Sequence, residues 1–208
     1  MTINGLLPNA DIIARFISEV TSDWSDASDQ EDCFEIRCLG QGPTPVTRSF
    51  RLSAAAQAVE HAVRTNQNRL NVYMTINPIE CNPLISAGKS ATDNDILRAH
   101  YNFADADDEK GLEGLKKLAE SIEPDIIVTT GTIPYERQHN YWRLKEPCRD
   151  LELWRRMQVD IATQFGTDTT VINPSRIMRI AGSVTYPNVN KRTRGYVPEL
   201  VSMRVRAG

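Results

Sequence analysis

The chain has 208 residues, 40% of them hydrophobic and 25% charged, with a formal net charge of -3. This length and composition suit one globular domain or two small lobes, and the slight acidity does not suggest a bulk nucleic-acid binder, which needs a basic surface. No apolar run approaches the roughly 20 residues that cross a bilayer, and the N-terminus lacks the features of a signal peptide. We therefore expect a cytoplasmic protein with no membrane contact.

The first 70 residues predict a small α/β lobe. A helix is expected around residues 9–21, followed by strands at Cys33–Leu39 and Thr47–Leu52. A second helix is expected after Ser53, because serine is a favoured N-cap residue and the apolar side chains that follow have helical spacing.

Cysteine usage predicts thiols and no crosslinks. The four cysteines are scattered and form no CxxC pair, at positions Cys33, Cys38, Cys81 and Cys148. Such spacing argues against a zinc knuckle and against a disulfide framework. We expect all four to be reduced and mostly buried.

Residues 71–208 predict a second lobe in which strands and helices alternate. The expected elements are a strand at 100–106, a helix with apolar residues from Leu112 to Ile122, strands at 126–130 and 140–144, a helix at 151–165, and strands at 176–184 and 196–203. Strand, helix, strand, strand, helix, strand is the order of a split βαβ sheet. We therefore predict an α+β fold with an RNA-recognition-like sheet in residues 71–208, packed with the small lobe of residues 1–70.

Two aspartates, Asp105 and Asp107, end the first strand of this second lobe. Side chains alternate along a strand, so the two carboxylates share a face about 7 Å apart and repel each other by on the order of 2 kcal/mol. A divalent cation such as Mg²⁺ or Mn²⁺ would relieve that repulsion. Because Asp108 and Glu109 follow, the same stretch is also an ordinary acidic start of a helix.

A second polar segment covers residues 137–144. If it is a strand, Trp142 faces the core while His139, Tyr141 and Arg143 share the opposite, cationic face. A histidine flanked by arginine is a poor base, because positive charge lowers its pKa, yet it can donate hydrogen bonds to phosphate. The alternative is an edge strand with a solvated polar face.

A third segment runs from Asp168 to Gly182. Asp168 follows the end of a helix and either caps a turn or supplies a third metal carboxylate. Arg176 and Arg179 fall on opposite faces of an extended strand, so one ligand meets both only if the chain bends. Gly182 would allow the backbone to approach a phosphate closely.

In order and spacing, the three segments resemble the motifs of the archaeo-eukaryotic primase superfamily, most closely the primase-polymerase domains of plasmids, phages and mobile elements. The resemblance spans roughly residues 70–196. Two positions depart from the family pattern: Asp168 follows Thr167 in an expected turn, and Ala181 stands where proline is usual. Asp150 is the substitute candidate for the third acid.

The resemblance implies a template-dependent nucleotidyltransferase, a DNA primase-polymerase that acts in replication, with residues 71–208 as the catalytic lobe of one domain. The implied catalytic and metal-binding acids are Asp105, Asp107 and Asp168, holding Mg²⁺ or Mn²⁺. The implied nucleotide-binding residues are His139, Arg137, Arg176, Arg179 and Lys191. The implied partners are a single-stranded DNA template, nucleoside triphosphates and a helicase domain or protein.

Two other functions stay open at this point. A non-catalytic nucleic-acid-binding module would keep the fold but leave Asp105 and Asp107 without a role. A metal-dependent nuclease or replication initiator would need a paired-histidine motif, and the chain's three histidines form no His-X-His pair. The sequence does not indicate whether ribonucleotides or deoxynucleotides are preferred, or whether priming occurs de novo.

Overall fold

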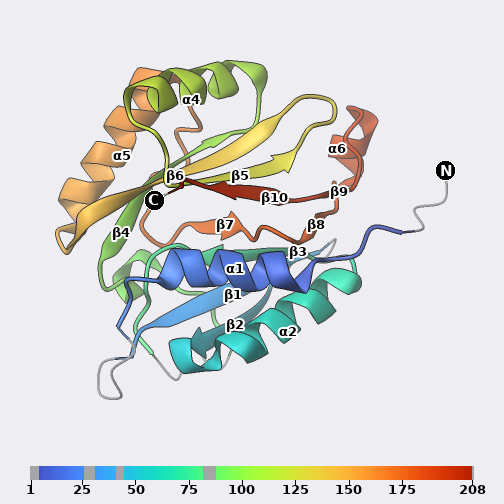
Figure 1. Cartoon of the computed structure of the whole chain (residues 1–208), viewed down its shortest axis with the longest axis horizontal. Helices are drawn as coiled ribbons and strands as arrows, with labels where there is room; N and C mark the ends of the chain where they lie inside the picture. The colour runs from blue at the N-terminus through green and yellow to red at the C-terminus, as the bar shows by residue number, and fades with distance from the viewer. Residues whose placement is uncertain (1–4, 26–30, 41–44, 82–87, 208) are drawn as a thin grey trace.

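A computed structural model describes residues 5–25, 31–40, 45–81 and 88–207 of the chain. Two four-stranded sheets form its framework (Figure 1). The first has the order β2-β1-β3-β7, with bounds Val46–Arg51, Cys33–Leu39, Asn71–Thr75 and Ile177–Arg179. The second has the order β10-β5-β6-β4, with bounds Ser202–Val205, Ile126–Gly131, Arg137–Cys148 and Ala99–Ala106. A short ribbon pairs β8 (Val184–Thr185) with β9 (Glu199–Leu200).

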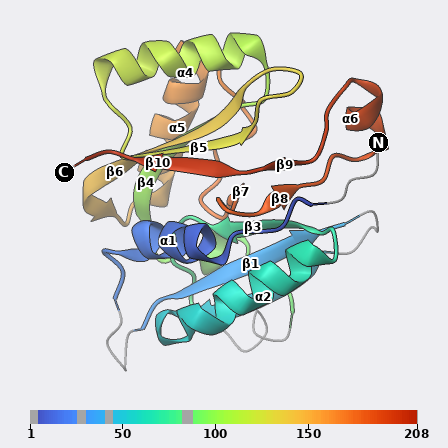
Figure 2. The same ribbon diagram turned by 45° about the vertical axis from the view of Figure 1, so that its right-hand side comes forward.

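The helices lie around and between these sheets. Their bounds are Ala10–Thr21 (α1), Ala55–Gln67 (α2), Glu109–Ser121 (α4), Leu151–Phe165 (α5) and Val189–Thr193 (α6). Helix α2 packs on the first sheet, α4 covers one face of the second, and α5 runs along its edge strand β4 (Figure 2). No helix in the described ranges is long and apolar enough to span a membrane.

Helix α1 joins the two sheets through the main hydrophobic core. Its N-cap is Asn9, whose side chain accepts a hydrogen bond from the Ile12 N–H at 3.1 Å. The buried side chains of the helix, including Phe16, belong to the same core as Phe34 of β1 and Tyr141 of β6. The helix predicted at 9–21 is thus confirmed, and its buried face packs against residues of both sheets.

The α+β class is confirmed, but the RNA-recognition-like arrangement is not. In a split βαβ unit, the two strands joined by the helix are parallel, and a third strand lies between them, antiparallel to both. Strands β4 and β5, joined by α4, have this arrangement, because each pairs antiparallel with β6, which lies between them. The fourth strand differs from the expectation: β7 pairs with β3 of the first sheet, and β10 lies beside β5 instead. The order of element types along the chain was predicted correctly, whereas the pairing depends on contacts that this order does not specify.

The first sheet draws strands from both predicted lobes. Strand β3 pairs with β1 on one side and with β7 on the other. A boundary between residues 70 and 71 therefore cuts through this sheet. It leaves β1 and β2 on one side and β3 and β7 on the other.

Two local predictions that concern the first lobe or its contacts are wrong. Ser53 does not cap α2: it lies within a 3-10 turn, and its N–H donates to Glu31 Oε1 at 2.7 Å. Cys33 and Cys81 are not free thiols but a disulfide, formed across 48 residues with a Cα–Cα distance of 5.5 Å. The fold brings the start of β1 beside the segment after β3, a proximity that cysteine spacing does not reveal.

Candidate functional site

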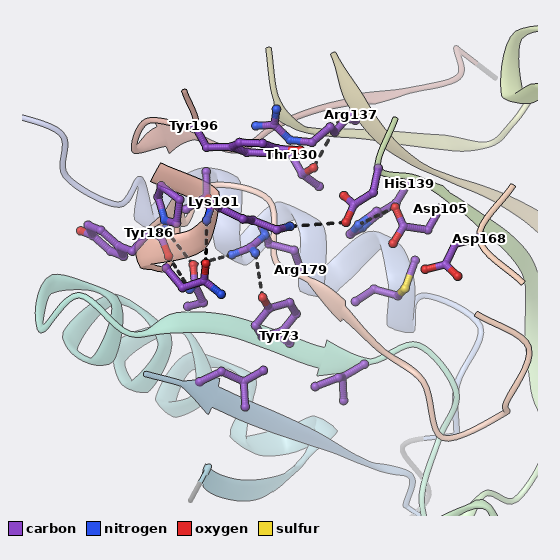
Figure 3. Close-up of a pocket in the computed structure, with 18 of the residues that line it drawn as sticks. Tyr73, Asp105, Thr130, Arg137, His139, Asp168, Arg179, Tyr186, Lys191 and Tyr196 are labelled. Carbon is purple, nitrogen blue, oxygen red and sulfur yellow. Dashed lines mark hydrogen bonds and ion pairs between the residues drawn. The ribbon is translucent and has the colours of Figure 1, made fainter. Parts of the chain in front are cut away.

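A polar cavity of about 410 Å³ lies between the two sheets (Figure 3). Strands β3 and β7 supply one wall, the ends of β4 and β6 supply the opposite wall, and α6 adds residues from its side. Side chains from both sheets therefore meet at this cavity. All eight residues implied by the sequence resemblance line it: Asp105, Asp107, Arg137, His139, Asp168, Arg176, Arg179 and Lys191.

Neither Asp105 nor Asp107 caps the helix that follows them. Asp108 is the N-cap of α4, and its carboxylate accepts a hydrogen bond from the Gly111 N–H at 2.7 Å. Asp105 lies near the end of β4 and Asp107 directly beyond it, and both line the cavity. The acidic helix start and the paired carboxylates thus coexist, because different aspartates form them.

The turn after α5 brings Asp168 to the same place. Its backbone N–H donates to the Asp105 carbonyl at 3.0 Å, and its carboxylate accepts from the Thr170 N–H at 2.8 Å. Asp168 therefore shapes a turn and also lines the cavity with the other two acids. Asp150, the substitute candidate, is instead the N-cap of α5, bonded to the Leu153 N–H at 2.9 Å.

Burial and like charge raise the pKa of Asp105. Burial together with the nearby carboxylates of Asp107 and Asp168 raises this pKa to about 8, against the opposing effect of Arg176 and Lys191. Its Oδ1 atom is buried without a hydrogen bond. A neutral carboxyl is therefore favoured at neutral pH unless additional positive charge enters the site.

His139 faces Asp105 across the β4–β6 pair. The two residues are in register, and the His139 Nε2 atom lies 3.5 Å from Asp105 Oδ1. Burial lowers the pKa of His139 to about 3; Asp107 opposes this shift, whereas Arg179, Arg176 and Lys191 act in the same direction as burial. The imidazole is thus neutral at neutral pH, so this contact is not an ion pair.

Replacing Asp105 with asparagine is expected to stabilise the metal-free protein, by an amount that grows from about pH 4 to about pH 8. In the unfolded chain the carboxyl ionises near its ordinary pKa of 3.8, whereas the folded protein keeps the proton up to about pH 8. The stability that the neutral carboxyl supplies is fully present below the unfolded pKa and is lost as the pH rises through the folded pKa. Thermal unfolding in a chelating buffer at several pH values measures the difference. A gain that stays constant across this window would contradict the raised pKa.

Arg179 is held rigidly against the first sheet. Its guanidinium donates to Asn71 Oδ1 and to the Tyr73 hydroxyl, both at 2.7 Å, and lies 4.7 Å from the centre of the Tyr73 ring. Asn71 also accepts from the Tyr186 N–H at 2.8 Å, which ties the segment after β8 to the same strand. These contacts orient a permanent positive charge on the cavity wall (Figure 3).

Arg176 reaches the same cavity as Arg179 because the chain bends before β7. The strand begins only at Ile177, and the preceding turn is fixed by Asp93, whose Oδ1 accepts from the Ser175 N–H at 3.1 Å and from its hydroxyl at 2.6 Å. A bend was the condition under which Arg176 and Arg179 could reach one ligand, and the turn before Ile177 supplies it.

Arg137 uses its donors within the protein. One nitrogen donates to the carbonyls of Ile133 and Tyr135, each at 2.8 Å, and another lies 3.0 Å from Glu199 Oε2. Its guanidinium also stacks 4.6 Å from the centre of the Tyr196 ring. Arg137 lines the cavity, but these contacts indicate that it mainly holds the β5–β6 turn in place.

Lys191 approaches the acids from α6. Its ammonium lies 3.4 Å from Asp107 Oδ2, which links the helix to the end of β4 across the cavity (Figure 3). The side chain is partly exposed, so this pair contributes little to stability. The contact matters for position, because it places a partly exposed cation beside the carboxylates.

The predicted cationic face of β6 is present only at one end. Tyr141 is fully buried in the main core, and Trp142 packs against α4 on the other side of the sheet. Arg143 lies away from the cavity and pairs with Asp23 beyond α1. Both faces of this strand are covered, because α1 and the first sheet lie on one side and α4 on the other.

Gly182 does not serve the cavity. Its φ of +85° is in the left-handed region, and a Cβ there would lie 2.7 Å from the Asn9 carbonyl oxygen. The glycine allows the chain to pass the start of α1, where the Asn9 N–H donates to the Gly182 carbonyl at 2.8 Å. The prediction of a phosphate contact at this residue is therefore wrong.

The sequence reasoning missed the polar face of β3. Asn71 and Tyr73 of β3 line the cavity, as does Arg69 just before the strand, whereas Val72 and Met74 are buried. This alternation is a readable signal, because every second side chain of a strand shares a face.

The three acids are not arranged as a preformed metal site. In the parts of the chain that the structure describes, no group of three or more His, Cys, Asp or Glu side chains has a geometry able to hold an ion. Two observations nevertheless fit a cation: the buried Asp105 Oδ1 lacks any donor, and the mutual repulsion of the carboxylates raises the pKa of Asp105. Oxygen donors of this kind suit Mg²⁺ or Mn²⁺.

Comparison with known proteins supports the same fold. No protein-family model and no curated protein matches the sequence. The AEP domain of the primase-polymerase of cyanophage S-2L is 20% identical, with a TM-score of 0.64 over 96% of this chain and 91% of that one. Primase RepB′ is 16% identical, with a TM-score of 0.60 over 94% of this chain and 55% of that one.

The catalytic domain of RepB′, solved in complex with initiator DNA, is also 16% identical, with a TM-score of 0.57 over 92% of this chain and 82% of that one. At these identities the likeness concerns the fold. It agrees with the order of the three motifs in the sequence. The chain thus has the fold of these primase domains.

Proposed function

We propose that this domain is a template-dependent nucleotidyltransferase, a DNA primase-polymerase that joins nucleotides during replication. The observation that carries the proposal is the meeting, in one cavity of a primase fold, of three acids from the second lobe with cations from β7 and α6. Acids on one wall and cations on the other match the two needs of phosphoryl transfer. One is to hold divalent ions, and the other is to neutralise the phosphates.

The acids Asp105, Asp107 and Asp168 would hold Mg²⁺ or Mn²⁺. When bound, such ions lower the pKa of an attacking 3′-hydroxyl and stabilise the leaving pyrophosphate. Loading the site requires Asp105 to release its proton, because its pKa is raised to about 8. It also requires Lys191 to move away from Asp107 Oδ2. The ammonium then becomes available to the phosphates of the incoming nucleotide.

The opposite wall would bind the nucleoside triphosphate. Arg179 is oriented by Asn71 and Tyr73, and Arg176 has no ion pair within the described residues. Arginine side chains fixed in this way stabilise charge that develops on a transferred phosphoryl group. The neutral His139 would donate a hydrogen bond to the same group, since its low pKa excludes a role as a cationic acid at neutral pH.

Primer extension tests the proposal directly. Primed and unprimed single-stranded DNA templates are incubated with labelled nucleotides and Mg²⁺ or Mn²⁺. We expect metal-dependent products whose sequence follows the template, and parallel reactions with ribonucleotides and deoxynucleotides establish the preferred sugar. DNA binding without any product would identify a non-catalytic module and overturn the proposal. A helicase domain or protein remains the partner to seek once synthesis is established.

Replacing Arg179 with lysine is expected to raise the KM for nucleotides by about 10-fold, with a smaller effect on kcat. Lysine keeps the charge but cannot donate to Asn71 and Tyr73 in the fixed geometry that the guanidinium has. Steady-state primer extension measures both constants. Arg156→Lys is the matched control, because Arg156 is exposed on α5 and does not line the cavity. Equal KM values for Arg179→Lys and the wild type would contradict a phosphate-binding role.

A further inference from the structure

A second surface adjoins the cavity and is built from two segments far apart in the sequence. We call it the rim: residues 132–135 of the β5–β6 turn together with residues 189–197, which contain α6. The two segments lie side by side in Figure 1, and one hydrogen bond between the Tyr135 and Tyr196 hydroxyls joins them directly. Lys191 extends from the rim into the cavity.

The rim is anchored, so it presents a defined shape. Glu199 accepts hydrogen bonds from the Thr132 N–H at 2.6 Å and from the Thr132 hydroxyl at 2.7 Å, and it also pairs with Arg137. The buried ring of Tyr196 lies under three cations, with Lys191 at 5.5 Å and Arg194 at 5.3 Å from its centre in addition to Arg137.

Positive charge on the rim is largely unneutralised. The two segments of the rim contain Lys191, Arg192 and Arg194 and no Asp or Glu. Arg192 and Arg194 are exposed, and neither has a carboxylate within ion-pair distance in the described ranges of the chain. Arg137 and Lys191 have acidic partners, so the free charge lies on the outward side of α6.

The same rim exposes apolar side chains. Val189 is 56% exposed, Ile133 is 48% exposed and Val197 is 39% exposed. Tyr135 adds a partly exposed aromatic ring next to them. Unpaired cations interleaved with exposed apolar and aromatic groups match single-stranded nucleic acid, whose phosphates take the charge and whose unpaired bases stack on the rings. The centre of a protein interface is instead depleted of charge.

We propose that the rim binds the single-stranded template where it leaves the cavity, with its phosphates on Arg192 and Arg194 and a base against Tyr135. The identity of the strand as a template rests on the proposed function. The binding itself rests on the charge and exposure of the rim. Lys191 of α6 lines the cavity, so the rim begins where the cavity ends. A template strand paired to a nucleotide in the cavity would therefore pass over the rim as it leaves.

Fluorescence anisotropy with a labelled oligothymidylate of about 12 nucleotides, without nucleotides or metal ions, tests the inference. For Arg192→Glu/Arg194→Glu we expect binding at least about 10-fold weaker. We also expect the slope of log K against log salt to be shallower by about 1.4, because each lost single-strand phosphate contact removes about 0.7. Tyr135→Ala should weaken binding by about 10-fold, whereas Tyr135→Phe, which keeps the ring, should bind like the wild type.

The control is Arg149→Glu/Arg156→Glu, which makes the same change of net charge at exposed arginines outside the cavity and the rim. Wild-type binding by this control, with the loss confined to the rim variants, supports the inference. Equal losses in both double variants would reveal a bulk charge effect, and wild-type binding by the rim double variant would mean that the strand lies elsewhere; either result overturns it. Because the assay needs no catalysis, a wild type that binds DNA but makes no product would overturn only the proposed function.

Discussion

Replacing Asp105 with alanine is expected to lower primer extension by about 10³-fold, the scale on which removal of one transition-state-stabilising group acts. Asp107→Ala should have a similar effect, because both carboxylates line the cavity where divalent ions would bind. Single-turnover extension with Mn²⁺ measures the loss. Removal of Asp105 also removes a buried carboxyl that lacks a hydrogen-bond donor, so the variant should stay folded. Lost activity is then attributable to the site.

Asp108→Ala is the matched control for these variants, since it lies next to the pair but caps α4. It should lose about 1 kcal/mol of stability and retain extension at a temperature where it is folded. Near-wild-type synthesis by Asp105→Ala would contradict the proposed chemistry. So would an Asp108→Ala protein that is folded but inactive, because the acids would then matter through the helix and not through metal ions.

The largest expected effect on stability belongs to Trp154. Its side chain is fully buried, its indole N–H donates to the Tyr101 carbonyl at 2.9 Å, and its ring centre lies 5.4 Å from that of Phe103. Trp154→Ala should lower the free energy of unfolding by about 4 kcal/mol, because it opens a cavity and leaves a carbonyl without this donor. Urea denaturation measures the change.

Two further variants separate volume from hydrogen bonding. Trp154→Phe should lose roughly half as much as Trp154→Ala, because the phenyl ring fills part of the space but donates no hydrogen bond. Leu153→Ala, at a neighbouring position that is 44% exposed, should change stability by less than about 0.5 kcal/mol. Similar losses for Leu153→Ala and Trp154→Ala would show that α5 packs differently from the structure.

The sequence predicted well those features that local chemistry determines. Helix α5 begins and ends at the predicted residues, because its apolar stripe is continuous and Gly166 adopts the left-handed conformation that ends it. The strand that carries Asp105 was visible as an apolar run that ends in acids. All eight implied site residues line the cavity, although their chemical roles stay predictions.

The features that were missed depend on contacts between distant segments. The bend that aims Arg176 into the cavity is fixed by Asp93, more than 80 residues earlier in the chain. The disulfide of Cys33 and Cys81 likewise reflects proximity in space, and the two-sided burial of β6 depends on which layers cover it. Periodicity within one segment contains no information about such partners.

The position of β3 between β1 and β7 limits how the chain can be shortened. A fragment that starts at residue 71 would lack β1 and β2, so one side of β3 would present unpaired N–H and C=O groups to solvent. Open strand edges of this kind pair with other molecules and aggregate. The three acids of the site all lie after residue 71. A soluble fragment that contains them nevertheless needs β1 and β2, because β1 covers the open edge of β3.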